Sequence, residues 1–194
     1  MATKRLMLAF SGGSGAIYGI RGLEALRRTG EIETHVIVTR AGARMLAAET
    51  GHTPRDLTRL ADIVHDASRR KPPPFPAPLD TLGLLVAPCS PQSLRAVADE
   101  DKGDLVARTA ASCLARHRRV VLLLTEARLE PVTIQLMAKA TRLGAVITLP
   151  VPAFYHRPSS LDDIIDQTVG RALDLFDVEA GLVRRWTEDD RPGP

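Results

Sequence analysis

The sequence predicts a single α/β domain, built on a doubly wound, mostly parallel sheet between two layers of helices. Short, continuously apolar runs recur along the chain, which is typical of strands that are buried on both faces of a parallel sheet. Segments with helical periodicity separate these runs. The chain has 194 residues, of which 44% are hydrophobic and 25% charged, and this suffices for one domain with a sizeable core.

The predicted elements alternate along the chain. Strands are expected where the apolar runs occur, at 5–10, 34–39, 82–87, 119–124 and 144–149. Helices are expected at about 14–29, 40–50, 54–61, 91–98, 103–116, 131–143 and 160–176. The last helix begins "SSLDDII", with a serine that can cap it and acidic residues in its first turn. This order indicates a three-layer sandwich of the Rossmann or flavodoxin type. We expect one domain over residues 1–186 and a mobile tail over 187–194.

Charge and apolar patterning exclude several classes of protein. The isoelectric point of about 9.2 is basic, but the net charge is only +3, and Lys and Arg alternate with Asp and Glu. The densest basic runs are short and have no aromatic neighbours, so we expect an anionic small molecule rather than a nucleic acid as partner. No apolar run is long enough to span a membrane, and the N-terminus lacks a signal-peptide pattern, so the cytoplasm is the expected location.

Cysteine and histidine spacing argues against disulfide and metal sites. Cys89 and Cys113 lie 24 residues apart without a partner motif, so reduced thiols are expected. The five histidines lie at least 13 residues apart, and no pair has the spacing of metal ligands. No His-Asp arrangement accompanies Cys89, so we expect its thiol to pack as a small apolar group rather than to act as a nucleophile.

The segments that follow the predicted strands indicate where a ligand binds. In doubly wound sheets, ligands bind beyond the carboxyl ends of the strands. The five segments read "SGGSG", "RAGAR", "PCSPQS", "TEARLEP" and "PVPAFYHRP". Four of them are rich in Ser, Thr, Gly or Pro, a composition suited to backbone NH and hydroxyl contacts with an anion.

The glycine-rich turn at 11–15 fits neither of the two common nucleotide-binding templates. Counted from Gly13, the dinucleotide pattern G-x-G-x-x-G has Tyr18 at its third glycine, and the second strand ends in Thr39-Arg40 rather than in an acidic residue. The turn also lacks the lysine of a Walker loop. A helix whose first turn offers free NH groups can instead hold one phosphate, as a mononucleotide such as FMN requires. A glycine-rich turn without a ligand remains the alternative.

Three stretches together carry a resemblance to a known family. "SGGSGAIYG" near the N-terminus, "APCSPQSL" after the third predicted strand and "PVPAFYHRPSSLDDIIDQTVGRALDLFDV" near the C-terminus resemble, in this order, the UbiX-type flavin prenyltransferases. These flavoproteins were formerly regarded as aromatic-acid decarboxylases. The resemblance covers roughly residues 4–186. It implies a Rossmann-like or flavodoxin-like fold and a homo-oligomer, often a dodecamer, with active sites at subunit interfaces.

The resemblance also implies a reaction. Proteins of this family bind FMN and dimethylallyl phosphate, and they join the dimethylallyl group to N5 and C6 of the flavin without a metal. A decarboxylase of the UbiD type then uses the prenylated FMN. The chain is therefore expected to be a flavin prenyltransferase, with reduced FMN as bound substrate and a UbiD-type decarboxylase as the recipient of its product.

The family's functional positions match individual residues of this chain. The FMN-binding positions match Gly12, Gly13, Ser14, Thr39, Ser90, Pro91, Gln92, Ser93 and Thr125. The positions that bind the prenyl substrate match Arg108, Tyr155, Arg171 and Trp186, where donors would stabilise the departing phosphate. Glu49 and Glu126 are candidates for general acid or base, and Ser14 could orient or relay a proton. Solvated surface positions are the alternative for the charged residues among them.

The chain departs from the family pattern at two cationic positions. Where the family has an arginine and a lysine that hold phosphates, this sequence has Thr125 and Ala115, although Arg116 or Arg128 could reach in from a neighbouring position. These losses leave open a second function, a catalytically impaired FMN-binding subunit that supports or delivers flavin to a decarboxylase. A flavoprotein that decarboxylates peptidyl or pantothenoyl cysteine is a third, but no segment of this chain matches its substrate loop and catalytic histidine.

Overall fold

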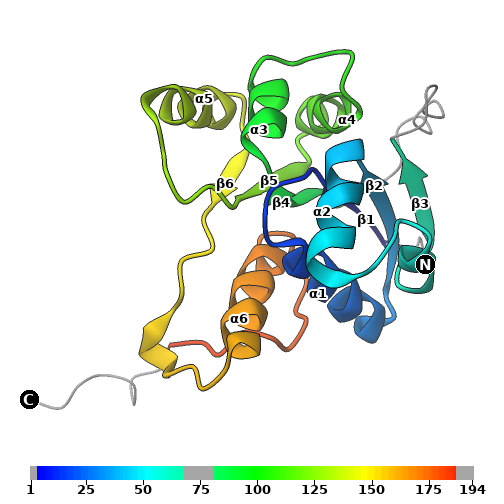
Figure 1. Ribbon diagram of the computed structural model, residues 1–194, viewed down its shortest axis with the longest axis vertical. Helices are drawn as coiled ribbons and strands as arrows, with labels where there is room; N and C mark the ends of the chain where they lie inside the picture. Colours follow the sequence, from blue (N-terminus) through cyan, green and yellow to red (C-terminus); the bar gives the residue numbers. More distant parts are fainter. Residues whose placement is uncertain (1–3, 68–80, 187–194) are drawn as a thin grey trace, which may run out of the picture.

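The structure is a computed structural model that describes residues 4–67 and 81–186, and one six-stranded sheet forms its centre (Figure 1). The strand order is β3-β2-β1-β4-β5-β6, and every neighbouring pair is parallel. The strands are β1 (Lys4–Phe10), β2 (Ile32–Val38), β3 (Ile63–Asp66), β4 (Gly83–Cys89), β5 (Arg119–Leu124) and β6 (Val146–Thr148). The predicted doubly wound α/β fold is therefore confirmed, whereas the predicted mobile tail lies outside the described residues.

Helices cover both faces of the sheet. On one face lie α1 (Ala16–Thr29), α2 (Arg40–Thr50) and α6 (Leu161–Asp174), and on the other lie α3 (Pro91–Ala98), α4 (Leu105–Leu114) and α5 (Pro131–Arg142) (Figure 1). Alternate residues of β1 enter different cores: Leu8 and Phe10 pack with Leu23 of α1, and Met7 packs with Leu94 of α3. Burial on both faces explains why the predicted strands are continuously apolar.

Three elements differ from the sequence-based expectations. The edge strand β3 is not expected, because only Ile63 and Val64 of its four residues are apolar. The segment 54–61 forms only a short 3₁₀ helix (Asp56–Arg59), because the chain must return to the sheet directly after it. The strand expected at 144–149 is shorter and ends before Pro150, which cannot donate a ladder hydrogen bond.

The winding of the chain creates a switch point between β1 and β4. From β1 the chain winds outward through β2 to β3, and it then returns to β4 on the other side of β1. The helices that follow β1 and β4 therefore lie on opposite faces, which leaves a crevice at the carboxyl ends of these two strands. The turns after β1, β2, β4 and β5 meet at this edge.

The chain between β6 and α6 extends away from the sheet. Residues 149–160, here called the extension, include the 3₁₀ helix η2 (Phe154–His156) and run to the lower left of Figure 1 before α6 returns beside α1. Arg21 of α1 pairs with Asp162 (2.7 Å) and Asp166 of α6 and so fastens the two helices together. The extension carries exposed apolar side chains, namely Leu149, Val151, Phe154 and Tyr155.

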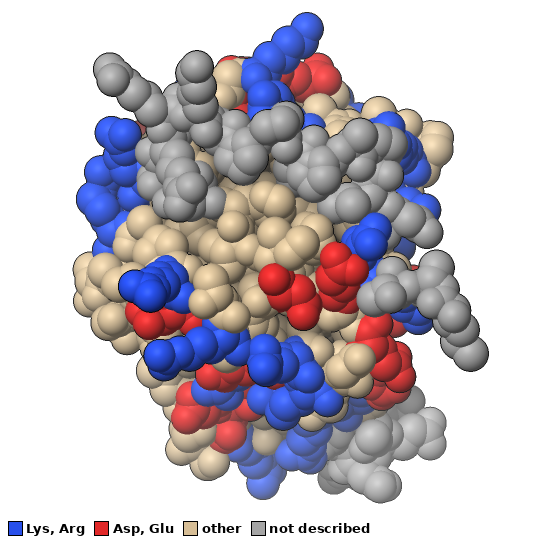
Figure 2. Space-filling model, turned by 90° about the vertical axis from the view of Figure 1, so that its right-hand side faces the viewer, with Lys and Arg blue, Asp and Glu red and all other residues tan. Residues whose placement is uncertain are grey.

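Charges of both signs share the surface on the β3 side of the molecule. Figure 2 shows basic and acidic side chains interspersed around a central uncharged area. This distribution differs from the continuous basic stripe of a typical nucleic-acid-binding surface. Within residues 4–67 and 81–186, no helix has both the length and the apolar character needed to cross a membrane.

Candidate functional site

The turn between β1 and α1 passes directly over the ends of β4 and β5. A Cβ atom on Gly13 would lie 2.7 Å from Thr125 Oγ1 and 3.1 Å from the carbonyl oxygen of Cys89, so only glycine fits at this crossing. Gly12 has a φ of 100°, a left-handed conformation that glycine adopts without strain. The NH groups of Gly12, Gly13 and Ser14 donate no hydrogen bond to the described part of the chain. Successive free NH groups of this kind suit a phosphate.

Glu49 caps the N-terminal end of α1, although it comes from the last turn of α2. Its Oε2 accepts hydrogen bonds from the NH groups of Gly15 (2.9 Å) and Ala16 (2.7 Å), and its Oε1 accepts one from the Ser14 hydroxyl (2.7 Å). The positive end of the helix dipole favours this carboxylate. The expectation that the first turn of α1 offers its NH groups to a phosphate is therefore wrong for Gly15 and Ala16. The free NH groups lie earlier, in the turn itself.

The hydrogen bond between Ser14 and Glu49 joins two of the three residues predicted to act on protons. Both side chains are exposed, so a ligand in the crevice can reach them. A carboxylate that accepts a hydroxyl hydrogen bond can take up a proton through that hydroxyl. This arrangement can therefore relay a proton between a ligand and Glu49.

Thr39 lies beside the same turn. Its NH group donates to the carbonyl oxygen of Phe10 (3.1 Å), and its Oγ1 accepts a hydrogen bond from the NH group of Gly42 (3.0 Å), which caps α2. Within the described residues, the hydroxyl proton of Thr39 has no acceptor. Thr39 can therefore donate to an anionic ligand, in agreement with the role predicted for it.

The segment 90–93 after β4 is fixed by Ser11, a residue that the sequence analysis missed. Ser11 Oγ donates to the carbonyl oxygen of Pro88 (2.9 Å) and accepts from the NH group of Ser90 (2.9 Å). Ser90 Oγ donates to the carbonyl oxygen of Ser11 (3.2 Å) and accepts from the NH group of Ser93 (3.2 Å). Ser90 and Ser93 are buried, and the Ser90 hydroxyl is fully used, so it fixes the loop rather than offering itself to a ligand. The only signal for Ser11 in the sequence is its place directly after β1.

Glu126, the third predicted acid or base, lines a hollow of about 370 Å³ at the ends of β4 and β5. Pro91 and Gln92, two predicted FMN contacts, line the same hollow. Glu126 accepts a hydrogen bond from the NH group of Arg128 (3.2 Å). The side chains of Arg128 and Arg95 also line it, and neither forms an ion pair with a described residue. These arginines bring positive charge close to the position where Thr125 replaces the family arginine.

The donors at this edge of the sheet fit a mononucleotide such as FMN. Thr125 Oγ1 is buried, has no hydrogen-bond partner among the residues that the structure describes, and lies under the Gly13 turn. Together with the free NH groups of the turn and the Thr39 hydroxyl, it forms a set of neutral donors around one crevice. Such a set binds a phosphate without a lysine, which agrees with the failure of the Walker template.

Cys89 is not a nucleophile in this structure. It is fully buried at the end of β4, and burial raises the pKa of its thiol to about 12. A thiol with this pKa stays protonated at neutral pH. The expectation that Cys89 packs as a small apolar group is confirmed.

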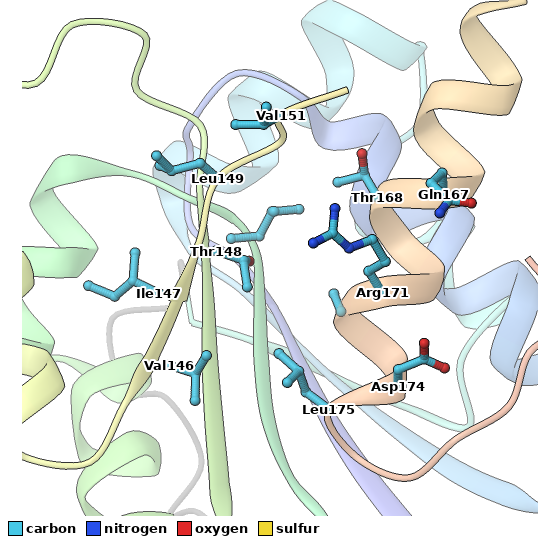
Figure 3. Close-up of a pocket in the computed structure, with 12 residues that line it drawn as sticks. Val146, Ile147, Thr148, Leu149, Val151, Gln167, Thr168, Arg171, Asp174 and Leu175 are labelled. Atoms are coloured by element: carbon cyan, nitrogen blue, oxygen red, sulfur yellow. The ribbon is translucent and has the colours of Figure 1, made fainter. Parts of the chain in front are cut away.

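Tyr155 and Trp186 contact each other at the end of the extension. Their ring centroids lie 5.1 Å apart with an interplanar angle of 72°, an edge-to-face arrangement. Arg171 points from α6 into a cavity of about 550 Å³ between α6 and β6 (Figure 3). Leu149 and Val151 form part of its apolar wall. The guanidinium of Arg171 has no ion pair or hydrogen bond within the described residues, so it can bind an anion.

One chain does not bring all the predicted residues together. Figure 1 shows η2, which contains Tyr155, well away from the turn that carries Ser14. Arg108 is exposed on α4, on the opposite face of the sheet from α6. The residues predicted to bind flavin therefore cluster within one chain, whereas those predicted to bind the prenyl substrate lie at separate places.

Comparisons with known proteins agree with this site. The model of the family described as Flavoprotein matches residues 1–183. The flavin prenyltransferase UbiX of Thauera aromatica is 42% identical over 186 residues, which cover 96% of this chain and 95% of that protein. The crystal structure of AnUbiX (PadA1) in complex with FMN and dimethylallyl pyrophosphate has a TM-score of 0.84 and 38% identity, and the match covers 95% of this chain and 97% of that one.

Two further structures mark the range of the similarity. The dodecameric FMN-dependent UbiX-like protein of Escherichia coli O157:H7 has a TM-score of 0.83 at 30% identity, over 94% of this chain and 99% of that one. A phosphopantothenoylcysteine-type (PPC) decarboxylase has a TM-score of 0.55 at 18% identity, over 77% of this chain and 84% of that one, and so shares only the fold. The full-length matches, the fold and the glycine-rich turn together show that the chain belongs to the flavoprotein family and, within it, to the UbiX-type flavin prenyltransferases.

Proposed function

We propose that this protein is a flavin prenyltransferase, which joins the dimethylallyl group of dimethylallyl phosphate to N5 and C6 of reduced FMN. The observation that carries the proposal is the 42% identity to a flavin prenyltransferase over 96% of the chain. The geometry agrees with it, because free backbone donors for a phosphate lie next to the hydrogen-bonded pair of Ser14 and Glu49. The protein would then act as one domain over residues 1–186.

The chain's own residues divide the work between binding and proton transfer. The NH groups of Gly12, Gly13 and Ser14 and the hydroxyl of Thr39 hold the phosphate of FMN, while Pro91 and Gln92 contact the flavin. Breaking the allylic C–O bond leaves its electron pair on the phosphate, which Arg171 and Tyr155 stabilise as its charge develops. Arg108 and Trp186 complete the substrate site, with Trp186 as a wall that keeps water from the allylic cation. FMN supplies the two nucleophilic atoms.

Proton transfer falls to the three acid-base residues. Bond formation at N5 releases a proton, and ring closure at C6 requires one proton to be added to the alkene and another to leave C6. Glu49 can exchange protons through the Ser14 hydroxyl, with which it shares a hydrogen bond of 2.7 Å. Glu126 lies beside the flavin-contacting segment and can serve the second transfer.

We infer the assembly and the recipient of the product from the relatives. The E. coli O157:H7 structure is described as dodecameric, which supports a homo-oligomer, and a dodecamer in particular. A UbiD-type decarboxylase is the proposed recipient of prenylated FMN. A cytoplasmic location is consistent with the two free cysteines, Cys89 and Cys113.

An impaired FMN-binding subunit remains the second candidate, because Thr125 and Ala115 lack the cationic groups of the family. One experiment separates the two functions. Purified protein is incubated with reduced FMN and dimethylallyl phosphate, and the mass and visible spectrum of the flavin are measured. A covalent gain of one five-carbon unit supports the transferase, whereas tightly bound but unchanged FMN supports the second candidate.

A further inference from the structure

Gln167 is a buried polar residue of α6 that holds the chain after this helix. Its side chain is only 3% exposed. Its Nε2 donates to the carbonyl oxygen of Arg184 (3.2 Å), and its Oε1 accepts from the NH group of Arg184 (2.9 Å). One amide side chain therefore pairs with both backbone groups of Arg184. These bonds hold residues 182–186, here called the C-terminal segment, against α6.

The C-terminal segment lies in direct contact with α6 at Gly170. A Cβ atom on Gly170 would lie 2.5 Å from Val183 Cγ2 and 2.9 Å from Leu182 Cβ. Gly170 is three residues after Gln167 and so lies on the same side of the helix. Close packing and the paired hydrogen bonds of Gln167 therefore act together to fix the segment.

The same amide also holds Tyr155. Gln167 Nε2 donates to Tyr155 Oη (3.0 Å), and Tyr155 Oη donates to the carbonyl oxygen of Arg184 (3.2 Å). Arg184 Nη1 in turn donates to the carbonyl oxygen of His156 (3.1 Å). Tyr155 precedes α6 and Trp186 follows it, yet their rings are in edge-to-face contact. Gln167 thus joins chain segments that leave opposite ends of one helix.

Gln167 also lies one helical turn from Arg171. Residues four apart on a helix are neighbours on its surface, and both residues line the cavity between α6 and β6 (Figure 3). A buried amide with three hydrogen bonds cannot rotate without losing them. The position of the Tyr155–Trp186 pair relative to the Arg171 guanidinium therefore depends on Gln167.

We propose that Gln167 is a positioning residue of the substrate site: it fixes Tyr155 and Trp186 as one unit relative to Arg171. The proposal rests on the proposed function, which assigns these three residues to the prenyl phosphate. A preformed arrangement lowers the entropy cost of binding, because the substrate does not have to order the aromatic pair itself. Without Gln167, the extension and the C-terminal segment lose their common hydrogen-bond partner.

The test uses the variant Gln167→Met, which keeps the length of the side chain and removes its hydrogen bonds. Trp186 is the only tryptophan of the chain, so acrylamide quenching of its fluorescence reports on the C-terminal segment independently of activity. We expect quenching to rise about twofold, and KM for dimethylallyl phosphate to rise about tenfold with kcat within about threefold of wild type, as for lost uniform binding. FMN affinity should not change, because the Gly12–Ser14 turn is untouched.

Two further variants guard against a general loss of structure. Arg185→Gln removes an exposed ion pair between the same segment and Asp174 (3.1 Å), and it should leave both readouts close to wild type. Gln167→Glu keeps an acceptor for the NH group of Arg184 but loses the donor for Tyr155. It should therefore fold and lie between wild type and Gln167→Met in both quenching and KM.

Wild-type quenching in Gln167→Met would overturn the proposal, and so would raised quenching with an unchanged KM. Failure of the proposed function has a different signature, because the wild-type protein would then form no prenylated flavin. In that case the quenching contrast between Gln167→Met and Arg185→Gln, combined with a titration of the FMN-loaded proteins with dimethylallyl phosphate, still decides whether Gln167 positions the site.

Discussion

At the residue scale, the hydrogen bonds of Glu49 show how one carboxylate can serve both the fold and the reaction. Its two oxygens accept from two backbone NH groups of α1 and from the Ser14 hydroxyl. The backbone donors hold the carboxylate in place and favour its charged form. The remaining hydrogen bond, to Ser14, is the one that a ligand can use.

Glu49→Gln should lower the prenylation rate about 100-fold or more, because the amide cannot accept a proton while it keeps the shape of the side chain. Its carbonyl oxygen can still accept from the NH groups of Gly15 and Ala16, and its NH₂ group can donate to Ser14 Oγ, so the fold should be retained. Single-turnover formation of prenylated FMN measures the effect. Glu31→Gln, at an exposed position between α1 and β2, is the matched control. A rate within a few-fold of wild type in Glu49→Gln would show that Glu49 has no acid-base role.

A buried histidine pair makes stability depend on pH. His65 Nε2 lies 3.3 Å from His35 Nδ1, and His35 Nε2 contacts Glu33 Oε1 at 2.7 Å. Burial, and next the neighbouring His35, lower the pKa of His65 below its ordinary value of 6.5. Hydrogen bonds from His35 and Arg5 lower the pKa of Glu33, so its contribution is lost only at more acidic pH.

The sign of this effect follows from proton binding. The unfolded chain protonates His65 near pH 6.5, whereas the folded protein does so only at lower pH, so stability is retained above 6.5 and falls as the pH decreases below it. We expect the free energy of unfolding, measured with urea, to decrease from about pH 7.5 to about pH 5.5. His65→Gln should make this decrease smaller. An equal slope in wild type and variant would contradict the prediction.

At the scale of elements, the strands that the sequence predicts correctly are those buried on both faces. β1, β4 and β5 are central and read as continuous apolar runs, whereas the edge strand β3 has no such signal. The winding then places the turns of the site at one edge. Which partners meet there depends on contacts between distant segments, such as Glu49 with α1 or Gln167 with Arg184. No local pattern in the sequence reveals such contacts, although family resemblance identifies several of the residues.

The ion pairs between α1 and α6 join the element that carries Ser14 to the element that carries Arg171. Arg21 Nη2 lies 2.7 Å from Asp162 Oδ1, Nη1 contacts Asp166, and the arginine side chain is only 18% exposed. Arg21→Met should lower the free energy of unfolding by about 1–2 kcal/mol, because two carboxylates lose their partner. Arg21→Lys should cost less, since it keeps a charge but cannot bridge both carboxylates. Urea unfolding of the three proteins measures the difference, and equal stabilities would refute the role of this pairing.

At the scale of the whole molecule, the separation of the predicted residues points to a site shared between subunits. Within one chain, Tyr155 lies on the extension, far from the Ser14 turn, and exposed apolar side chains accompany it (Figure 1). An extension with such side chains is stable in water only if another surface covers part of it. In a closed homo-oligomer, the extension of one subunit can reach the crevice of the next.

Mixing two inactive variants tests this shared site. Glu49→Gln removes the proton acceptor from the crevice, and Tyr155→Phe removes a substrate donor from the extension. If each site takes these residues from different chains, random mixed oligomers restore about one quarter of the sites to the wild-type set, because each partner is intact with a probability of about one half. The two variants are co-expressed with different affinity tags, and prenylation by doubly purified oligomers is compared with that of each variant alone. Activity near one quarter of wild type would place the two residues on different chains. Activity at the mean of the two variants would place them on the same chain, because every site would then carry one of the two substitutions.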